Sequence, residues 1–433
     1  MDYVVLPKII RALGSRNYRI FFFAQAVSLV GLWMQRIAMG WLIYRLTNAP
    51  SALGKVDFAA CIPSLILVGV TGPVLARVDL RKALYITQSL LSFSAALIAL
   101  LTWTKWISYE WILWISLFLG TVNAFDMTAR QSLVVYLVDQ KEDMSNALAL
   151  NSSLFNVARL IGPSVAGVLI HHIGEALCFA MNSLAYTTTI FALRATRMTN
   201  KPIIRSKPQE TRGKGMIRNM MEGIGYVRAF PPFFYSLMMV SAAGIFGFPY
   251  IVLMPAMARD TLGGNAKTMG VLLFAIGIGA LIGSLIMAAR KSPVGLDRWQ
   301  MRTAMAFGVF VMFFSLTRSV RVAMLALVPL GFCMVTTIIA CNTFLQSLVY
   351  DEHRSSMMSL YICCSVGIPP FGSVLVGGLG DIIGTPGALF ISGLLCLLSC
   401  GYFARRMKRY RLVIIKQYKR SGFNLKEAKM QRW

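Results

Sequence analysis

The chain has 433 residues, of which 57% are hydrophobic and 14% charged, and its formal net charge is +26 at pH 7. In a soluble protein such a charge would indicate nucleic-acid binding, but here the basic residues lie between long apolar segments. The composition therefore excludes an ordinary soluble domain, argues against a nucleic-acid partner, and indicates a multi-pass membrane protein.

The apolar segments, taken in chain order, are long enough to cross a bilayer, because about 20 apolar residues span a hydrocarbon core of roughly 30 Å. Twelve spans are predicted, at residues 18–44, 52–76, 84–104, 111–134, 146–170, 176–193, 233–258, 270–289, 303–316, 323–349, 357–380 and 388–403. Lys and Arg concentrate in the termini and in the even-numbered gaps. Because basic flanks stay on the cytoplasmic side, both termini are predicted to be cytoplasmic in a protein of the bacterial inner (plasma) membrane.

The two halves of the chain repeat each other. The string QSLV occurs at residues 131–134 and 346–349, each time at the end of an even-numbered span and before a short charged gap. The predicted organisation is a cytoplasmic N-terminus (1–17), a six-helix bundle (18–193), a basic cytoplasmic linker (194–232), a second six-helix bundle (233–403) and a basic cytoplasmic tail (404–433). Apolar residues recur at helical spacing over 216–227, which predicts a linker helix on the membrane surface. Anionic lipids are expected partners of the basic tail.

Ionisable side chains inside the spans are the best indicators of mechanism, since a charge in hydrocarbon is costly unless it is paired or faces water. Asp126 and Arg130 are spaced i, i+4, so they can pair on one helix face, either as a structural latch or as proton-coupling groups. Arg36 and Asp57 lie in consecutive antiparallel spans at comparable depth. A cross-helix pair between them is predicted, and Asp57 is a further proton-coupling candidate.

Arg159 lies near the middle of the fifth span, on one stripe with Asn151 and Phe155. A guanidinium at that depth suits a substrate carboxylate, catecholate or phosphate, and an ion pair with an acid of a neighbouring helix is the alternative. The other polar candidates for substrate binding, besides Arg36, are Gln35, Asn123 and Asn342. These amides could equally form hydrogen bonds between helices.

Several sequence segments resemble one family. They are GLWMQR (31–36), FDMTARQSL (125–133), LMPAMAR (253–259), the loop GPVLARVDLRK (72–82) and GPSVAG (162–167). Together they resemble the major facilitator superfamily, and within it the branch of bacterial efflux proteins, the transmembrane secretion effectors, that includes the enterobactin exporter. The resemblance implies an all-α membrane protein of twelve transmembrane helices in two six-helix pseudo-repeats.

Two of these segments resemble motifs of the superfamily. Gly72, Arg77, Asp79 and Arg81 match its gating motif, although Ala76 replaces the usual first acid. An ordinary positively charged cytoplasmic loop is the alternative interpretation.

The segment with Gly162, Pro163 and Gly167 resembles a motif associated with antiporters. The proline removes a backbone donor, and the glycines allow close helix approach, so both a hinge and plain helix packing fit. Pro369 and Pro370 offer the same chemistry in the second half.

The resemblance also implies a function. We expect a secondary active transporter and not an enzyme, which exports a siderophore or a similar anionic or amphipathic metabolite as its small-molecule substrate. It would use a proton gradient and no cofactor or metal. A multidrug or lysophospholipid translocator is the first alternative. A membrane receptor or scaffold that has lost transport is the alternative from another class, for which the replacement at Ala76 is the only support.

Overall fold

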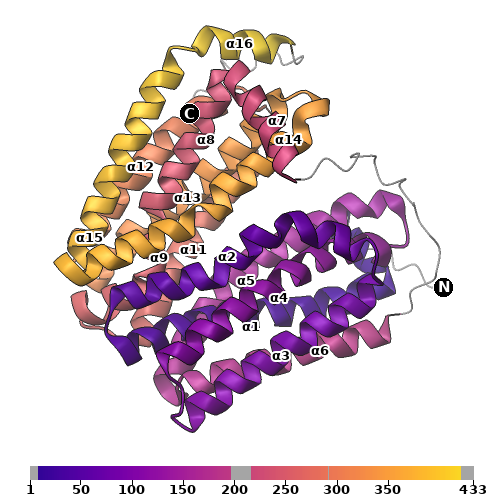
Figure 1. Ribbon diagram of the computed structural model, residues 1–433, viewed down its shortest axis with the longest axis vertical. Coiled ribbons are helices and arrows are strands. Elements are labelled where there is room, and N and C mark those ends of the chain that lie inside the picture. Colours follow the sequence, from indigo (N-terminus) through magenta and orange to yellow (C-terminus); the bar gives the residue numbers. More distant parts are fainter. Residues whose placement is uncertain (1–7, 197–215, 291, 421–433) are drawn as a thin grey trace. The chain divides into compact units, whose positions relative to one another are not determined.

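The computed structural model describes residues 8–196, 216–290 and 292–420 (Figure 1), and within these ranges all regular elements are helical. A short 3-10 helix, η1 (Lys8–Gly14), precedes the first long helix. The first half then contains α1 (Arg16–Thr47), α2 (Pro50–Leu75), α3 (Leu80–Trp103), α4 (Tyr109–Leu137), the turn η2 (Lys141–Asp143), α5 (Met144–Ile173) and α6 (Glu175–Ala195). The described part of the predicted linker holds α7 (Met216–Ala229).

The second half is more broken. Its first span consists of α8 (Pro231–Ala242), the π-helical turn η3 (Ala243–Gly247), α9 (Pro249–Val252), α10 (Met254–Ala256) and a second π-helical turn, η4 (Met257–Thr261). The following spans are α11 (Ala266–Ala288), α12 (Leu296–Leu316) and α13 (Val320–Leu348). The last part comprises α14 (Asp351–Ile362), the π-helical turn η5 (Cys363–Gly367), α15 (Pro369–Lys408) and α16 (Arg411–Arg420).

Eleven stretches of the described residues are long and apolar enough to cross a membrane. The last of them, Glu352–Lys408, has 57 residues, which at 1.5 Å per residue is roughly 85 Å and far exceeds one hydrocarbon core. Gly384 divides it, because its φ of 78° and ψ of 155° are not helical and reverse the chain. This stretch therefore provides two crossings, and the chain has the twelve-helix fold that the sequence predicts.

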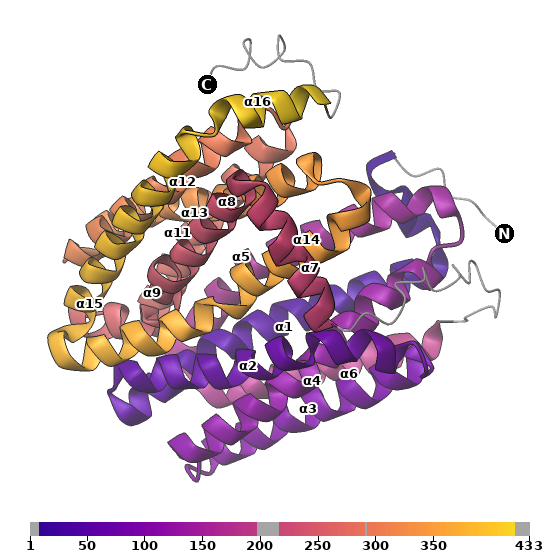
Figure 2. The same cartoon turned by 45° about the horizontal axis from the view of Figure 1, so that its top comes forward.

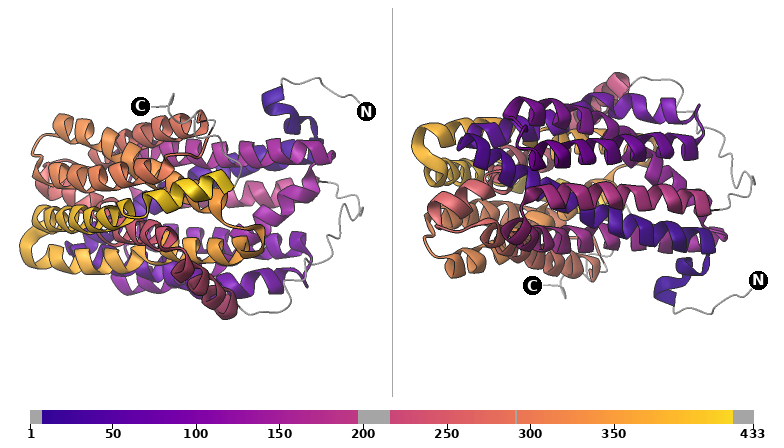
Figure 3. Two further views of the ribbon diagram at one scale, coloured as in Figure 1. Left: turned by 90° about the horizontal axis from the view of Figure 1, so that it is seen from above. Right: turned by 90° about the horizontal axis from the view of Figure 1, so that it is seen from below.

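Local chemistry sets several helix ends. Asn48 adopts a left-handed conformation after α1, and Pro50 begins α2, so the first two spans meet in a tight turn. Gly174, with φ of 95°, separates α5 from α6 in the same way. Figure 3 shows that the long helices of each unit run alongside one another. Within the first unit, α1 packs against α5 and α6, and α3 packs against α6.

The helices differ from the predicted spans mainly at their ends. The ninth span was predicted to begin at residue 303, but α12 begins at Leu296, because a helix tolerates the charged residues Asp297, Arg298 and Arg302 that hydropathy excludes. The gap predicted at residues 381–387 is helical apart from the turn at Gly384. The predicted tail, in turn, contains the end of α15 and the helix α16.

The described helices form two compact units that do not coincide with continuous halves. The first unit contains residues up to Asn48, then Ala59–Arg212, and also Asn265–Phe274 from the start of α11. The second contains Gly213–Gly264 and Ala275–Trp433, together with Ala49–Phe58 from the start of α2. The start of α2 thus belongs to the second unit and the start of α11 to the first. The predicted domain boundaries, including the linker at residues 194–232, stay a prediction.

Within the second unit, α16 lies across one end of the helices (Figures 1 and 2). Its Tyr418 is 1% exposed and donates a hydrogen bond to the Pro293 carbonyl at 2.9 Å. Gln417 Nε2 donates to the Leu348 carbonyl at the end of α13 at 3.2 Å. The part of the basic tail that forms α16 is therefore packed against the helices and is not an extended segment.

Candidate functional site

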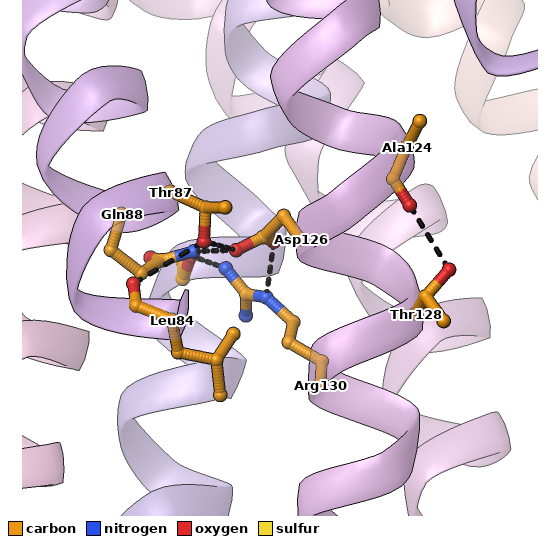
Figure 4. Close-up of polar contacts among 8 residues, drawn as sticks. Leu84, Thr87, Gln88, Ala124, Asp126, Thr128 and Arg130 are labelled. Carbon is orange, nitrogen blue, oxygen red and sulfur yellow. Dashed lines mark hydrogen bonds and ion pairs between the residues drawn. The ribbon is translucent and has the colours of Figure 1, made fainter. Parts of the chain in front are cut away.

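A buried ion pair lies inside the first unit, between α3 and α4 (Figure 4). Arg130 Nε donates to Asp126 Oδ2 at 2.6 Å. The other carboxylate oxygen, Asp126 Oδ1, accepts hydrogen bonds from Thr87 Oγ1 at 2.7 Å and from Gln88 Nε2 at 2.5 Å. The predicted i, i+4 pair is therefore present, and side chains of α3 hold its carboxylate.

The pair is almost fully withdrawn from solvent, since Asp126 is 5% exposed and Arg130 8%. Arg130 Nη2 also donates to Ser28 Oγ of α1 at 3.2 Å. Arg130 Nη1 and Gln88 Oε1 are buried without a hydrogen-bond partner among the described residues. A donor and an acceptor in the same cluster are thus available for internal water, which commonly satisfies such groups.

Asp126 lies in the second half of α4, toward its C-terminal end. It lies eight residues before Val134, where the apolar stretch of α4 ends, so the distance to that end is about 12 Å along the helix axis. A charged pair at this depth, with hydrogen-bonding capacity left over, is a candidate functional site.

Gln35 of α1 is buried, and it accepts a hydrogen bond from Asn182 Nδ2 of α6. This amide therefore joins two helices, which is the structural alternative left open by the sequence. Asn123 lies half-buried on α4, one turn before Asp126. Its predicted part in substrate binding stays a prediction.

Arg159 is half-buried at the middle of α5. Its Nη2 donates to Asn156 Oδ1 at 3.2 Å, three residues earlier on the same helix. Asn151 Oδ1 is buried without a partner among the described residues, whereas Phe155 on the same stripe is 39% exposed. The stripe predicted from the sequence therefore combines a guanidinium, an amide and an aromatic ring.

Arg36 is exposed on α1, and its guanidinium carbon lies 5.7 Å from the centroid of the Trp33 ring. The Trp33 and Phe155 rings are also 5.7 Å apart, edge to face at 70°. Asp57 belongs to the second unit, where its Oδ2 accepts a hydrogen bond from Ser373 Oγ at 2.9 Å. The predicted pair between Arg36 and Asp57 stays a prediction.

The residues of the predicted gating motif have structural roles in the first unit. Asp79 caps the N-terminus of α3, where it accepts hydrogen bonds from the backbone N–H groups of Arg81 at 2.8 Å and Lys82 at 3.4 Å. Arg81 Nη2 donates to the carbonyls of Leu193 and Arg194 at the end of α6, where a cation offsets the negative end of the helix dipole. Gly72 and Arg77, near the end of α2, are exposed. A gating role for the four predicted residues stays a prediction.

Gly162 lets α5 approach α1 closely. A Cβ atom built on it would lie 2.5 Å from Trp33 Cβ and 3.1 Å from the Val30 carbonyl oxygen. A Cβ on Gly167 would lie 2.9 Å from the Cα of Gly270, which belongs to the same unit. Packing therefore accounts for both glycines.

Pro163 lies within α5, whose helix runs from Met144 to Ile173. A hinge at this motif stays a prediction.

In the second half, Pro369 and Pro370 begin α15, and one residue, Ile368, separates them from the π-helical turn η5. The same order, a π-helical turn, one apolar residue and a proline, occurs at η3 and Pro249. The turns η3 and η5 thus each interrupt a span just before a proline, where the regular hydrogen bonding of the helix is already broken. Asn342 on α13 accepts a hydrogen bond from Gln346 Nε2 of the next turn.

The sequence analysis did not single out the partners of the ion pair. These partners are the polar residues Ser28, Thr87 and Gln88, which lie in apolar spans. Polar residues in such spans are candidates for contacts between helices, but their spacing along the chain does not show that they share one partner. Trp33, which contacts Arg36, Phe155 and Gly162, was also missed.

A family model described as transmembrane secretion effector matches residues 11–418 of this chain. The chain belongs to this family of the major facilitator superfamily. It is 21% identical over 397 residues to the staphyloferrin A transporter of Staphylococcus aureus, covering 91% of this chain and 98% of that protein. It is 20% identical over 399 residues to the multidrug efflux pump Tap of Mycolicibacterium fortuitum, covering 90% and 96%.

Solved structures have the same fold. The nucleoside transporter NupG superposes with a TM-score of 0.67 at 11% identity, covering 93% of this chain and 99% of that one. A bacterial homologue of the human lysosomal transporter Spinster, inward-facing and occupied, superposes with a TM-score of 0.65 at 13% identity, covering 94% and 99%. The protein is therefore a multi-pass membrane transporter of small molecules and not an enzyme.

Proposed function

We propose that the transporter exports a siderophore or a similar anionic, amphipathic metabolite across the bacterial inner membrane by alternating access. Export is driven by protons that enter the cytoplasm, and Asp126 is the group that carries them. The observation that carries the proposal is the buried Asp126–Arg130 pair, with Thr87 and Gln88 on the second carboxylate oxygen.

Protonation of Asp126 would weaken its ion pair with Arg130 and so change which helices the cluster connects. The charged carboxylate binds Arg130 of its own helix and two side chains of α3. A neutral carboxyl keeps hydrogen bonds to α3 but loses most of its attraction for the guanidinium. Arg130 Nη2 already reaches Ser28 of α1, so release of the guanidinium alters the contacts between α1 and α4. A proton thus shifts the balance between two arrangements of the same helices.

An anionic substrate is supported by Arg36 and Arg159, two cations within the apolar stretches of α1 and α5. Guanidinium keeps its charge at every working pH and binds carboxylates and phosphates through two parallel hydrogen bonds. The similarity to a staphyloferrin A transporter supports a siderophore as the first substrate to test.

The test uses inside-out membrane vesicles that contain the full-length protein and whose interior is acidified by respiration. Staphyloferrin A or enterobactin is added outside, and an acridine dye reports the internal pH. Proton-coupled export predicts a rise in internal pH when the substrate is added, because a proton leaves the vesicle interior for each substrate molecule that enters. Asp126→Asn should abolish the dye response while the protein still binds the substrate.

Glu110→Gln is the matched control, because Glu110 is an exposed carboxylate on the same helix, and this variant should respond like the wild type. If Asp126→Asn retains the full response, Asp126 is not the proton carrier. If neither siderophore changes the internal pH, but one accumulates without a proton gradient, proton coupling is wrong.

A multidrug pump is the second candidate, which the similarity to the pump Tap favours. The same vesicles with ethidium, a planar cation, separate the two functions. A dye response to ethidium and none to either siderophore would replace the first proposal by the second. A receptor without transport predicts no response to any of these compounds, and a lysophospholipid translocator predicts a response to lysophosphatidylethanolamine alone.

A further inference from the structure

We propose that α1 and α5 form a subsite for a dianion whose two acidic groups are separated by a planar apolar body. Arg36 and Arg159 would bind the acidic groups, and Trp33 and Phe155 would contact the planar part. This inference rests on the proposed export of an anionic substrate, and it specifies the shape and charge spacing that such a substrate needs.

The contact between Gly162 and Trp33 sets the relative levels of the two helices. A Cβ on Gly162 would lie 2.5 Å from Trp33 Cβ, so the two residues are at the same depth. Three long helices, α2, α3 and α4, lie between them along the chain, so α1 and α5 run in the same direction. Arg159 lies three residues before Gly162, and Arg36 lies three residues after Trp33.

These offsets place one arginine on each side of the indole. Three residues correspond to about 4.5 Å along a helix, so the Cα atoms of Arg36 and Arg159 are separated by about 9 Å along the helix axes. Trp33 lies midway between them.

Two aromatic rings lie beside the arginines: Trp33 at the level between them and Phe155 one turn before Arg159 on α5. The Arg36 guanidinium carbon is 5.7 Å from the Trp33 centroid, and the Phe155 ring meets Trp33 edge to face at 5.7 Å. Phe155 is 39% exposed, so part of its ring surface is open to a ligand. Such rings bind planar groups through stacking and edge contacts, and a nearby guanidinium adds cation–π attraction.

Two further observations connect this surface with a ligand rather than with lipid. Arg36 is exposed and Arg159 half-exposed within apolar stretches, and charged groups at that depth face water or a ligand rather than hydrocarbon. The indole N–H of Trp33 is buried and donates to no acceptor among the described residues. A ligand oxygen or an internal water would satisfy this donor.

The test measures the affinity of the purified full-length protein in detergent micelles by isothermal titration calorimetry. Three probes separate charge from planarity. Naphthalene-2,6-dicarboxylate has two carboxylates at opposite ends of a planar ring system, naphthalene-2-carboxylate has one, and adipate has two without a ring. We expect the naphthalene dicarboxylate to bind at least tenfold more tightly than either of the others.

Substitutions test the role of each residue in the proposed subsite. Arg36→Gln and Arg159→Gln should each weaken binding of the dicarboxylate roughly 10- to 100-fold, which corresponds to one hydrogen-bonded charge. Both should leave binding of the monocarboxylate less affected. Trp33→Leu should reduce the preference for the naphthalene dicarboxylate over adipate. The matched controls are Arg19→Gln on the exposed start of α1 and Trp106→Leu, whose side chain is 79% exposed.

Equal affinities for the three probes would overturn the subsite. Full affinity in the double variant Arg36→Gln/Arg159→Gln would also overturn it, and thermal unfolding of each variant shows whether the protein is still folded. The outcomes are distinct from those of the transport test. If siderophores release protons from vesicles and Arg36→Gln has no effect on their binding, the subsite is wrong and proton-coupled export stands. If the dicarboxylate binds as expected but no substrate releases protons, the subsite stands and the coupling is wrong.

Discussion

The Asp126–Arg130 pair permits a double-mutant cycle whose outcome follows from the contacts of each oxygen. In Asp126→Asn the amide oxygen can still accept from Thr87 and Gln88, so the substitution removes chiefly the bond from Arg130 Nε. It also leaves a guanidinium that is only 8% exposed without its counter-ion. Removing one partner of a buried pair costs about 3–5 kcal/mol of the free energy of unfolding.

Arg130→Met strands the carboxylate instead, at a similar cost of about 3–5 kcal/mol at neutral pH. The double variant contains no unpaired charge. Its loss should be about 2 kcal/mol or less, because replacing a buried pair with neutral groups is often close to neutral.

The assay is unfolding by sodium dodecyl sulfate in mixed micelles, followed by circular dichroism, for the wild type, both single variants and the double variant. The expected coupling energy is the sum of the two single losses minus the loss of the double variant. It is at least about 4 kcal/mol, above the range that is usual for residues in direct contact. Glu110→Gln, an exposed carboxylate on the same helix, should change stability by no more than about 0.5 kcal/mol. A coupling energy below about 0.5 kcal/mol would refute the view that this pair is a strongly interacting buried unit.

Three other outcomes follow from the structure. Gly162→Ala should lower the unfolding temperature in detergent, because the new Cβ would lie 2.5 Å from Trp33 Cβ. The control Gly72→Ala should leave it unchanged, because a Cβ there meets nothing within 4 Å. Equal unfolding temperatures for the two variants would contradict the close contact at Gly162. Tyr418→Phe should cost about 0.5–1.5 kcal/mol of the free energy of unfolding, since it removes a buried hydrogen bond of α16, and an unchanged stability would show that this bond contributes nothing. A reporter fused after Trp433 should be active in the cytoplasm, because Lys and Arg are dense in the tail; a periplasmic signal would exclude twelve crossings with a cytoplasmic N-terminus.

The fold was largely predictable because the bilayer imposes a length and a polarity on every crossing. Apolar runs and the placement of basic residues were sufficient to predict twelve crossings in two halves. The helix ends were less predictable, because Asp297 and Arg302 lower the local hydropathy without ending α12. The turn at Gly384 is set by one positive φ, and it was predicted as a longer gap.

The candidate site was predictable only where it is local. Asp126 and Arg130 are four residues apart on one helix, so their pairing depends on helix geometry alone. The contacts of Asp126 with Thr87 and Gln88 depend also on how α3 is rotated about its axis. In a soluble helix an apolar stripe reveals this rotation. A membrane helix is apolar on nearly all sides, so the sequence does not show which polar residue faces a neighbouring helix.

The position of Gly162 shows why packing and mechanism are hard to separate on α5. Arg159 and Gly162 lie on the same stripe, and Gly162 sets how closely α5 approaches Trp33. A larger residue at position 162 would therefore move Arg159 away from Arg36 as well as weaken the packing. A transport defect in such a variant does not by itself demonstrate a hinge, because it would also change the spacing of the two guanidiniums. Only a variant that keeps wild-type stability and wild-type affinity for the dicarboxylate, and still fails to transport, would place a hinge at Gly162.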